Sequence, residues 1–391
     1  MARLKDIAKL CIDGDWIESK DQSDSGIRLI QTGNIGIGEY LDKTSRAKYI
    51  SEETFTALKC TEVFPYDVLI SRLPDPLGRG CVVPKGIGKA ITAVDCTIIR
   101  PDETRCLSKY LVYYTESKAY ADQIEKFTAG STRARISRKN LESIDIPTIP
   151  IEEQKKIVAI FDLIDALISL RKKQLQKLDD LVKSRFVEIF GDPETNPKGW
   201  KKGPLSQEII AANNGMARRG NDENGNIVMR LVELQDGYID YSNPNRIALT
   251  KDEKKRYLLK SKDFLFARVN GNPENVGRCA VFTDIGEPVY HNDHIIRVHF
   301  NEATIEGAFA SALFNSEYGK RQLKKQIKTS AGQYTVSQDG IGAIITILPP
   351  IELQKAFAAF VSQVDKSKLT VQQGLAKLEL LKQSLMQKYF G

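Results

Sequence analysis

The stretch PIEEQKKIVAIFDLIDALISLRKKQLQKLDDLVKSRFVEIFG, from Pro150 to Gly191, decides the fold of this chain, because PIELQKAFAAFVSQVDKSKLTVQQGLAKLELLKQSLMQKYFG repeats it from Pro350 to Gly391. The two stretches have equal length and align without a gap at a constant offset of 200 positions (350 − 150). Both begin with Pro-Ile-Glu, carry glutamine at the fifth position and end with Phe-Gly. The chain is therefore two copies of one unit, and each copy ends in this stretch.

Both stretches are predicted to be long helices. Proline suits a first helical turn and acidic residues there favour the helix dipole, while glycine followed by proline is typical of a helix end. Apolar residues recur with a period of seven, which indicates a coiled-coil seam. The series are Ile157, Ile164 and Leu178; Phe161, Ile168, Leu175, Val182 and Ile189; and Phe357, Val364, Val371, Leu378 and Leu385.

Two copies related by a twofold axis that crosses the helices must place those helices antiparallel. We therefore expect an antiparallel pair that holds two globular domains apart. A helix lying on its own domain is the alternative interpretation. It explains one apolar stripe, but it does not explain two matched helices of equal length.

Composition indicates an ordinary soluble protein. The chain has 391 residues, a net charge of +7, 41% hydrophobic and 27% charged residues, all within the usual range. It contains no apolar run of about 18 residues that could cross a bilayer, and its first residues lack the apolar core of a signal peptide. Six cysteines without a CxxC spacing favour free thiols in a reducing cytoplasm. We expect a cytoplasmic protein without a membrane segment.

The globular parts read as mixed α and β, so the predicted fold class is α+β with a pseudo-twofold internal repeat. The expected domains are residues 1–150, 151–191, 192–350 and 351–391, the second and fourth being the spacer helices. The main expected elements of the first copy are strands over 26–30, 67–72, 81–83 and 91–100 and a helix over 107–127. In the second copy, residues 230–234 are expected to match 28–32, residues 263–268 to match 67–72, and residues 277–279 to match 78–80.

Basic residues are concentrated in one patch per copy. Lys126–Lys139 contains five Lys and Arg residues and no acid, and Lys320–Lys328 also contains five and no acid. Patches at matching places fit a polyanion that is contacted twice. A solvated helix face is the alternative interpretation of either patch taken alone.

Arginines at matched positions add to this interpretation. Arg72 and Arg268 end matched strands, while Arg79 and Arg278 follow glycines that let a backbone approach a ligand closely. Arginine contacts guanine, and Asn or Gln contacts adenine, in two-point hydrogen bonds. Structural ion pairs, such as Arg72 with Asp67, are the alternative. The candidate DNA contacts are Arg72, Arg79, Arg133, Arg135, Arg138, Arg218, Arg219, Arg268, Asn270, Arg278, Lys324 and Lys325.

Catalytic motifs are nearly absent. The glycines over 33–38 are not followed by a predicted helix, no GxxxxGK[ST] motif occurs, and no [DN]PP[FYW] motif occurs, which argues against nucleotide and aminomethyltransferase sites. His291, His294 and His299 lack an acid or cysteine cluster nearby, so a metal site is not favoured. Asp102, Glu116 and Lys118 match a loose nuclease pattern, and a Mg²⁺-dependent nuclease remains an alternative function.

The arrangement resembles the specificity subunit of type I restriction-modification systems, over essentially the whole chain. The resemblance is carried by the Pro-Ile-Glu-x-Gln entries to both helices, by the repeated strands over 67–72 and 263–268, and by the Ala-Gly loops at 129–130 and 331–332. The second loop continues as Gln333-Tyr334-Thr335 and is two residues shorter than the first.

The resemblance implies two target-recognition domains, each reading one half of a split, asymmetric site in double-stranded DNA, separated by an antiparallel spacer. It implies no catalysis and no cofactor in this chain. It also implies two methyltransferase subunits, which use S-adenosylmethionine to methylate adenine, and restriction subunits with translocase and nuclease activity. A stand-alone DNA-binding scaffold is the second alternative function.

Overall fold

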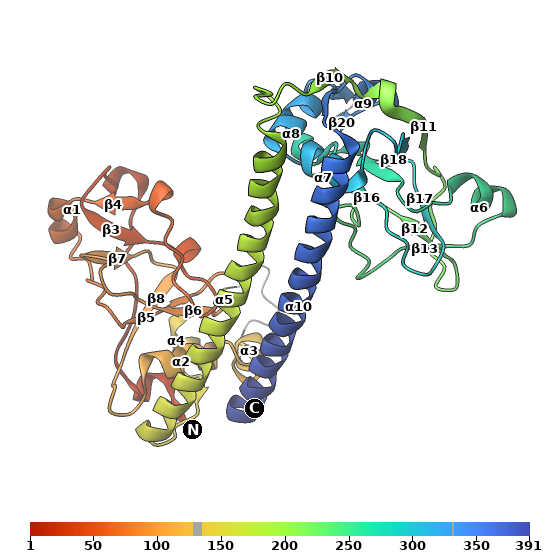
Figure 1. Cartoon of the computed structure of the whole chain (residues 1–391). Coiled ribbons are helices and arrows are strands. Elements are labelled where there is room, and N and C mark those ends of the chain that lie inside the picture. The colour runs from red at the N-terminus through yellow and green to blue at the C-terminus, as the bar shows by residue number, and fades with distance from the viewer. Residues whose placement is uncertain (128–134, 331) are drawn as a thin grey trace. The chain divides into compact units, whose positions relative to one another are not determined.

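The computed structural model describes residues 1–127, 135–330 and 332–391 (Figure 1). The chain divides into two compact units. Unit 1 contains Met1–Lys172 together with Gln373–Gly391, and unit 2 contains Lys173–Gln372. Each unit therefore takes in one part of each long helix, so the end of the chain belongs to the unit formed by its beginning.

Unit 1 is built on two small sheets. The first is an antiparallel sheet in the order β2-β8-β5-β6, and the second has the order β4-β3-β7, with β3 and β7 parallel. Short helix α1 (Glu52–Ala57) follows β4, and α2 (Ser108–Thr115), α3 (Lys118–Lys126) and α4 (Arg138–Glu142) follow β8. The strands are β2 (Ala8–Asp13), β3 (Ile27–Ile30), β4 (Lys48–Ile50), β5 (Val68–Ser71), β6 (Gly80–Val82), β7 (Ala90–Thr92) and β8 (Cys96–Pro101); β1 (Ala2–Arg3) pairs with β9 (Asp145–Ile146).

Unit 2 repeats this topology. The order β11-β18-β14-β16 matches the first sheet, and β13-β12-β17 matches the second, with β12 and β17 parallel. The strands are β11 (Ile209–Asn214), β12 (Asn226–Met229), β13 (Arg246–Ile247), β14 (Phe264–Ala267), β16 (Cys279–Val281), β17 (Val289–His291) and β18 (Ile295–Phe300); β10 (Lys201–Pro204) pairs with β21 (Ile345–Leu348), and β15 (Val269–Asn270), β20 (Gln333–Thr335) and β19 (Lys328–Ser330) form a third sheet. The helices are α6 (Lys251–Tyr257), α7 (Gly307–Phe314), α8 (Glu317–Lys324) and α9 (Gln338–Gly342).

Three sequence predictions are corrected by these elements. Residues 107–127 form two helices, because Ser117 is extended and its hydroxyl caps α3 by accepting a hydrogen bond from Tyr120 N. Residues 91–100 form two strands joined by a turn. The strand that matches β3 is β12, which ends at Met229, so residues 230–234 lie in the turn that follows it. Backbone pairing sets the match: Ala93 N donates to Ile30 O as Asn292 N donates to Met229 O.

The two long helices are confirmed: α5 spans Ile151–Phe190 and α10 spans Ile351–Phe390. Their predicted seam residues are all buried or half-buried. In unit 1 the ring of Phe161, early in α5, stacks on Phe390 at the end of α10, with centroids 6.0 Å apart. In unit 2 Phe190 meets Phe357 with centroids 5.5 Å apart. Within each unit the helices are therefore antiparallel, and their aromatic ends join the hydrophobic core.

A buried glutamine fixes the start of each helix to loops of its own unit. Gln154 Oε1 accepts a hydrogen bond from Leu107 N, and its Nε2 donates to Arg105 O and Ile149 O, all at 2.9 Å. Gln354 makes the same three bonds in unit 2, from Glu306 N and to Thr304 O and Pro349 O. Both side chains are fully buried, so the glutamine of the repeated motif has a structural role in both copies.

Candidate nucleic-acid interface

Arg72 fastens the end of β5 to the turn between β7 and β8. Its backbone N donates to Asp95 O at 2.8 Å. Its guanidinium donates to Val94 O at 2.6 Å and forms an ion pair with Asp13 at 3.3 Å. The residue is only 5% exposed, and its partner is Asp13 rather than the expected Asp67. These contacts and this burial give Arg72 a structural role, which argues against the predicted contact with DNA.

Arg268 holds the matching place in unit 2 with a different outcome. Its backbone N donates to His294 O at 2.7 Å, and its guanidinium donates to Asp293 O at 3.2 Å. Asn214 replaces the carboxylate of Asp13 at the end of the matched strand, and among the described residues no carboxylate forms a salt bridge with Arg268. The side chain is half-buried and lines an open hollow together with Asn214, Lys328 and Gln338.

The second pair of arginines also differs between the copies. The guanidinium of Arg79 donates four hydrogen bonds to backbone oxygens, those of Thr32, Ile35, Leu73 and Pro76, so four of its five N–H donors are occupied inside unit 1. Arg278 instead forms an ion pair with Asp236 at 3.4 Å and stays half-buried. The backbone bonds give Arg79 a structural role, and Arg278 also donates to Gln235 Oε1 at 3.4 Å. Whether either arginine contacts DNA stays a prediction.

The glycines before these arginines serve close packing. Gly78 and Gly277 have φ angles of +80° and +82°, which favour glycine. A Cβ on Gly78 would lie 2.8 Å from Ile124, and one on Gly277 would lie 2.9 Å from Leu323. Each glycine thus lets α3 or α8 pack closely on the loop. Packing thus explains both glycines, and the predicted approach of their backbone to a ligand stays a prediction.

The basic patch of unit 1 is partly neutralised. Arg135 forms an ion pair with Asp95 at 2.8 Å, and Arg138 pairs with Glu142 one turn along α4. Lys139 lies on α4 and is exposed. The predicted contact residue Arg133 lies outside the described residues.

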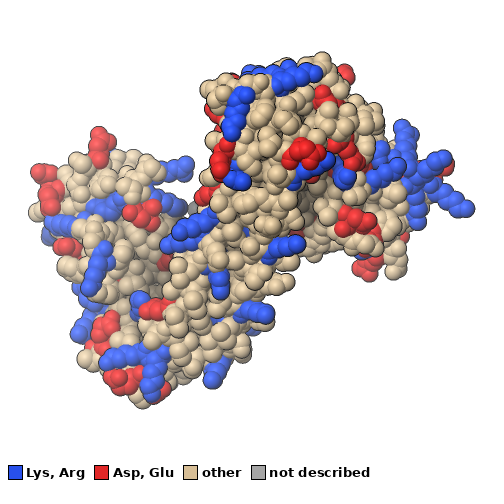
Figure 2. All heavy atoms as spheres, in the orientation of Figure 1, with Lys and Arg blue, Asp and Glu red and all other residues tan. Residues whose placement is uncertain are grey.

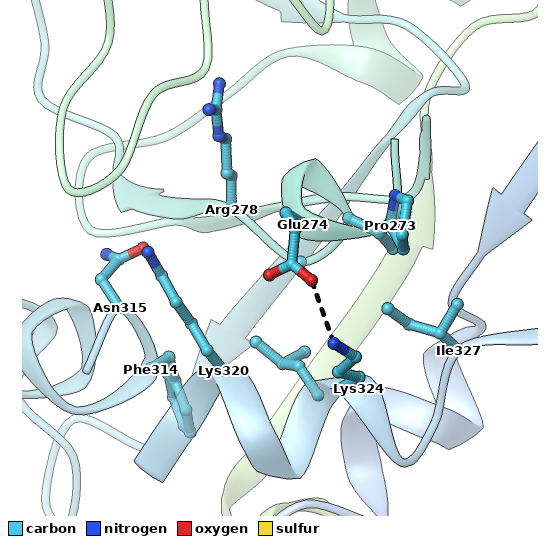
Figure 3. A pocket seen from close by; sticks show the side chains of 11 residues that line it. Pro273, Glu274, Arg278, Phe314, Asn315, Lys320, Lys324 and Ile327 are labelled. Atoms are coloured by element: carbon cyan, nitrogen blue, oxygen red, sulfur yellow. Dashed lines mark hydrogen bonds and ion pairs between the residues drawn. The ribbon is translucent and has the colours of Figure 1, made fainter. Parts of the chain in front are cut away.

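The basic patch of unit 2 is neutralised on α8. Lys320 pairs with Asp236 at 2.8 Å, Arg321 with Glu194 at 2.9 Å and Lys324 with Glu274 at 3.0 Å. Figure 3 shows Glu274 pointing at Lys324 across a depression that Pro273, Arg278 and Lys320 also line. Lys325 and Lys328 are exposed beyond this row of pairs.

The remaining candidates of unit 2 are Arg218 and Arg219, in the loop after β11, and Asn270, at the end of β15. Arg218 binds Glu253 through two nitrogens, and Arg219 binds Asp293 at 2.6 Å; both arginines are about half exposed. Asn270 accepts a hydrogen bond from Asn272 N, which shapes its loop. Whether any of these residues contacts DNA stays a prediction.

The residues of the nuclease alternative have separate partners. Asp102 binds Thr104, Lys118 pairs with Asp122 at 2.7 Å, and Glu116 pairs with Lys382 at 2.9 Å. Burial raises the pKa of the Glu116 carboxyl, while Lys382 opposes that rise. These contacts do not join the three side chains into a common site.

The described residues show neither a metal cluster nor a membrane-spanning helix. Within residues 1–127, 135–330 and 332–391, no group of three or more His, Cys, Asp and Glu side chains could hold a metal ion. His291 is fully buried, and burial lowers the pKa of its imidazole to about 4. No helix in the part of the chain that the structure describes is long and apolar enough to cross a membrane.

The sequence prediction missed one basic surface. Helix α6 carries Lys251, Lys254, Lys255 and Arg256, and all four side chains are exposed. Figure 2 shows Lys and Arg side chains gathered over this helix at the right edge of the view. The run KDEKKR is visible in the sequence, but it contains two acids, Asp252 and Glu253, so it does not stand out as an acid-free basic segment.

Comparison with known proteins identifies relatives of this chain. The family model described as the type I restriction modification DNA specificity domain matches residues 1–180 and again residues 197–380. The StySPI specificity subunit of Salmonella potsdam is 28% identical over 75% of this chain and 67% of its own length. The EcoKI specificity subunit of Escherichia coli K12 is 23% identical over the same shares.

Two solved structures share the fold. A chain from a study of complex assembly and conformational transition of a type I restriction-modification system aligns with a TM-score of 0.59, at 15% identity, over 100% of this chain and 96% of that one. The S subunit from M. genitalium aligns with a TM-score of 0.56, at 13% identity, over 100% and 95%. Because the family model covers both copies, this chain belongs to the type I restriction-modification DNA specificity family.

Proposed function

We propose that this chain is the non-catalytic DNA sequence-specificity subunit of a type I restriction-modification complex. One globular part, residues 1–150, reads one half of a split target, and the other, residues 192–350, reads the other half. The observation that carries the proposal is a duplicated scaffold with unlike surfaces: the strand order repeats, while the exposed charged and polar groups do not. Unlike surfaces on like scaffolds suit an asymmetric target.

The hollow around Arg268 is the best-supported reading site in unit 2. The half-buried guanidinium of Arg268 forms no salt bridge among the described residues, although the exposed Asp339 lines the same hollow. Such a guanidinium can donate two hydrogen bonds to guanine O6 and N7. Asn214 and Gln338, which are hydrogen-bonded to each other at 3.1 Å, carry amides of the kind that contact adenine. Lys328 at the rim suits a phosphate. Arg278 and Asn270 are further candidates nearby in the same unit.

The partners follow from the same proposal. Double-stranded DNA is the ligand, two methyltransferase subunits dock around the spacer helices over 151–191 and 351–391, and restriction subunits join that assembly. The methyl donor and ATP are bound by those subunits, so the cofactors of the complex lie outside this chain. The equal length of α5 and α10, 40 residues each, fits a spacer that fixes the distance between half-sites.

Methylome sequencing of the source cells tests this function. Deleting the gene should abolish methylation at one asymmetric, split motif, and supplying the wild-type gene should restore it. Unchanged methylation at every motif would overturn the proposal. Cleavage of DNA by the purified chain with Mg²⁺ alone would favour the nuclease, and a chain that recruits methyltransferase subunits without binding DNA would be an assembly scaffold.

A further inference from the structure

Helix α6 of unit 2 presents lysines that form no salt bridge, although the helix also contains the exposed Asp252 and the half-buried Glu253. Lys254 and Lys255 follow Lys251 by three and four positions, which places them on the same side of the helix as Lys251. All three side chains are exposed. Among the residues that the structure describes, no carboxylate forms a salt bridge with their ammonium groups. Arg256 adds a fourth exposed cation and lies over the ring of Tyr257.

The matched helix of unit 1 has the opposite charge. α1 and α6 follow matched strands and start in the same way: Ser51 Oγ accepts from Thr54 N, and Thr250 Oγ1 accepts from Glu253 N. The first turn of α1 contains Glu52 and Glu53, and α1 has no Lys or Arg. The fold therefore does not require a basic helix at this position, so the charge of α6 needs another explanation.

The rest of α6 is arranged so that the lysines face outward. The carboxylate of Glu253 binds Arg218 and also accepts from Thr250 N at 2.9 Å, which fastens the start of the helix to the preceding loop. Tyr257 packs inward beside the apolar cluster that contains Met216 and Tyr290. One of the two acids of α6 is thus occupied, and the inward face is the apolar one.

The paired basic row on α8 provides the contrast. Each of Lys320, Arg321 and Lys324 has its own carboxylate within 3.0 Å. Among the described residues no carboxylate, the nearby Asp252 included, forms a salt bridge with Lys251, Lys254 or Lys255. A surface of lysines with its apolar residues turned inward suits a polyanion in water rather than a lipid bilayer, which would require an exposed apolar face. Lysine acts on phosphate as a point charge and carries little base information.

We propose that α6 is a phosphate clamp, in which Lys251, Lys254 and Lys255 contact the DNA backbone beside the half-site read by unit 2. This inference rests on the proposed function. Because α1 lacks these cations, the clamp belongs to one half of the target. Through α6, unit 2 therefore contributes salt-dependent, sequence-independent affinity for DNA that unit 1 does not contribute through α1.

The test is the salt dependence of DNA binding by the full chain, co-expressed with the methyltransferase subunits of its own genome. The variant Lys251→Gln/Lys254→Gln/Lys255→Gln is compared with wild type on a duplex of arbitrary sequence and on a duplex with the methylated motif. Each phosphate contact contributes about 0.9 to the slope of log K against log salt. We expect the slope to fall by about 2 to 3, with equal fold losses on both duplexes and an unchanged methylated motif.

Two control variants make the result specific. Lys251→Arg/Lys254→Arg/Lys255→Arg keeps the charge and should keep the slope. Lys320→Gln/Arg321→Gln/Lys324→Gln removes three cations that are already paired, and it should change the slope less than the α6 variant does. A thermal melt of each variant checks that unit 2 is folded.

Two results would overturn the clamp while leaving the proposed function intact: a folded α6 variant with the wild-type slope, or a loss confined to the motif duplex. Wild-type protein that binds neither duplex would instead contradict the proposed function itself. The two failures are therefore distinguished by the wild-type measurement alone.

Discussion

The ammonium group of Lys382, near the end of α10, lies 2.9 Å from Glu116 Oε2 and 2.8 Å from Asp165 Oδ1 within unit 1. The Glu116 side chain is only 12% exposed. The matching position in unit 2, at the offset of 200, holds Val182, which packs on the hydrophobic core. The two copies thus fix their helices with different chemistry, a charged cluster in unit 1 and an apolar contact in unit 2.

Replacing the cation of this cluster should destabilise unit 1 in a pH-dependent way. Lys382→Met leaves Glu116 and Asp165 without their cation, and we expect a loss of about 2 kcal/mol at neutral pH. Burial already raises the pKa of Glu116 above its ordinary 4.5, so the folded state favours the protonated carboxyl. The penalty is therefore present above that raised pKa and diminishes as the pH falls through it.

Urea unfolding of the variant and wild type at pH 7 and pH 4 measures the difference in the free energy of unfolding. The double variant Lys382→Met/Glu116→Gln is the control and should recover part of the loss at pH 7. An equal loss at both pH values would show that the cation acts through packing instead.

His291 should make unit 2 sensitive to mild acid. Its side chain is fully buried, and Nδ1 lies 3.1 Å from Tyr257 O. Burial lowers the pKa of the imidazole from 6.5 to about 4, so the folded state holds the neutral form. This stability is fully present above pH 6.5 and is lost as the pH falls toward 4, by about 2 kcal/mol at pH 5.

The matched position of unit 1 supplies the variant. Thr92 pairs with Ile30 in β3 as His291 pairs with Met229 in β12. We expect the free energy of unfolding of wild-type unit 2 to fall between pH 7 and pH 5, and His291→Thr should remove this fall. Hydrogen exchange of the amides in β17 measures both. The same fall in the variant would assign the pH dependence to another group.

The long helices were predictable because their signal is regular. The seven-residue apolar period and the constant offset each extend over many residues, so no single residue decides the prediction. Prediction from the sequence failed where one residue decides. Ser117 divides a run that is otherwise helical, because its extended backbone and its hydroxyl start a new helix. The contrast between Arg72 and Arg268 depends on Asp13 or Asn214 on another strand. Such pairing is set by sheet register, which local patterns do not contain.

Arg72 and Arg268 should therefore respond differently to alanine. Arg72→Ala leaves Asp13 without its cation and Val94 O without its donor, and we expect unit 1 to lose about 2 to 3 kcal/mol. Arg268→Ala removes a half-buried side chain and should cost less stability, but it should relax the methylated motif in one half-site only. Thermal melts and methylome sequencing measure the two effects. A motif relaxed equally in both halves by either variant would contradict this assignment.

The spacer role of the helices gives the sharpest change in specificity. Removing Ser169–Leu175 from α5 and Leu369–Leu375 from α10 deletes matched residues near the middle of both helices. A deletion of seven residues preserves the seven-residue period, so the seam can re-form. Each helix shortens by roughly 10 Å at about 1.5 Å per residue, which corresponds to about three base pairs at about 3.4 Å each. We expect both half-sites of the methylated motif to keep their sequence while the gap between them shortens by about three base pairs.

Deleting the segment from α5 alone is the control: it mismatches the helix lengths, so methylation should be lost rather than shifted. A folded double-deletion variant that methylates the original motif at its original spacing would show that the helices do not set the distance between half-sites.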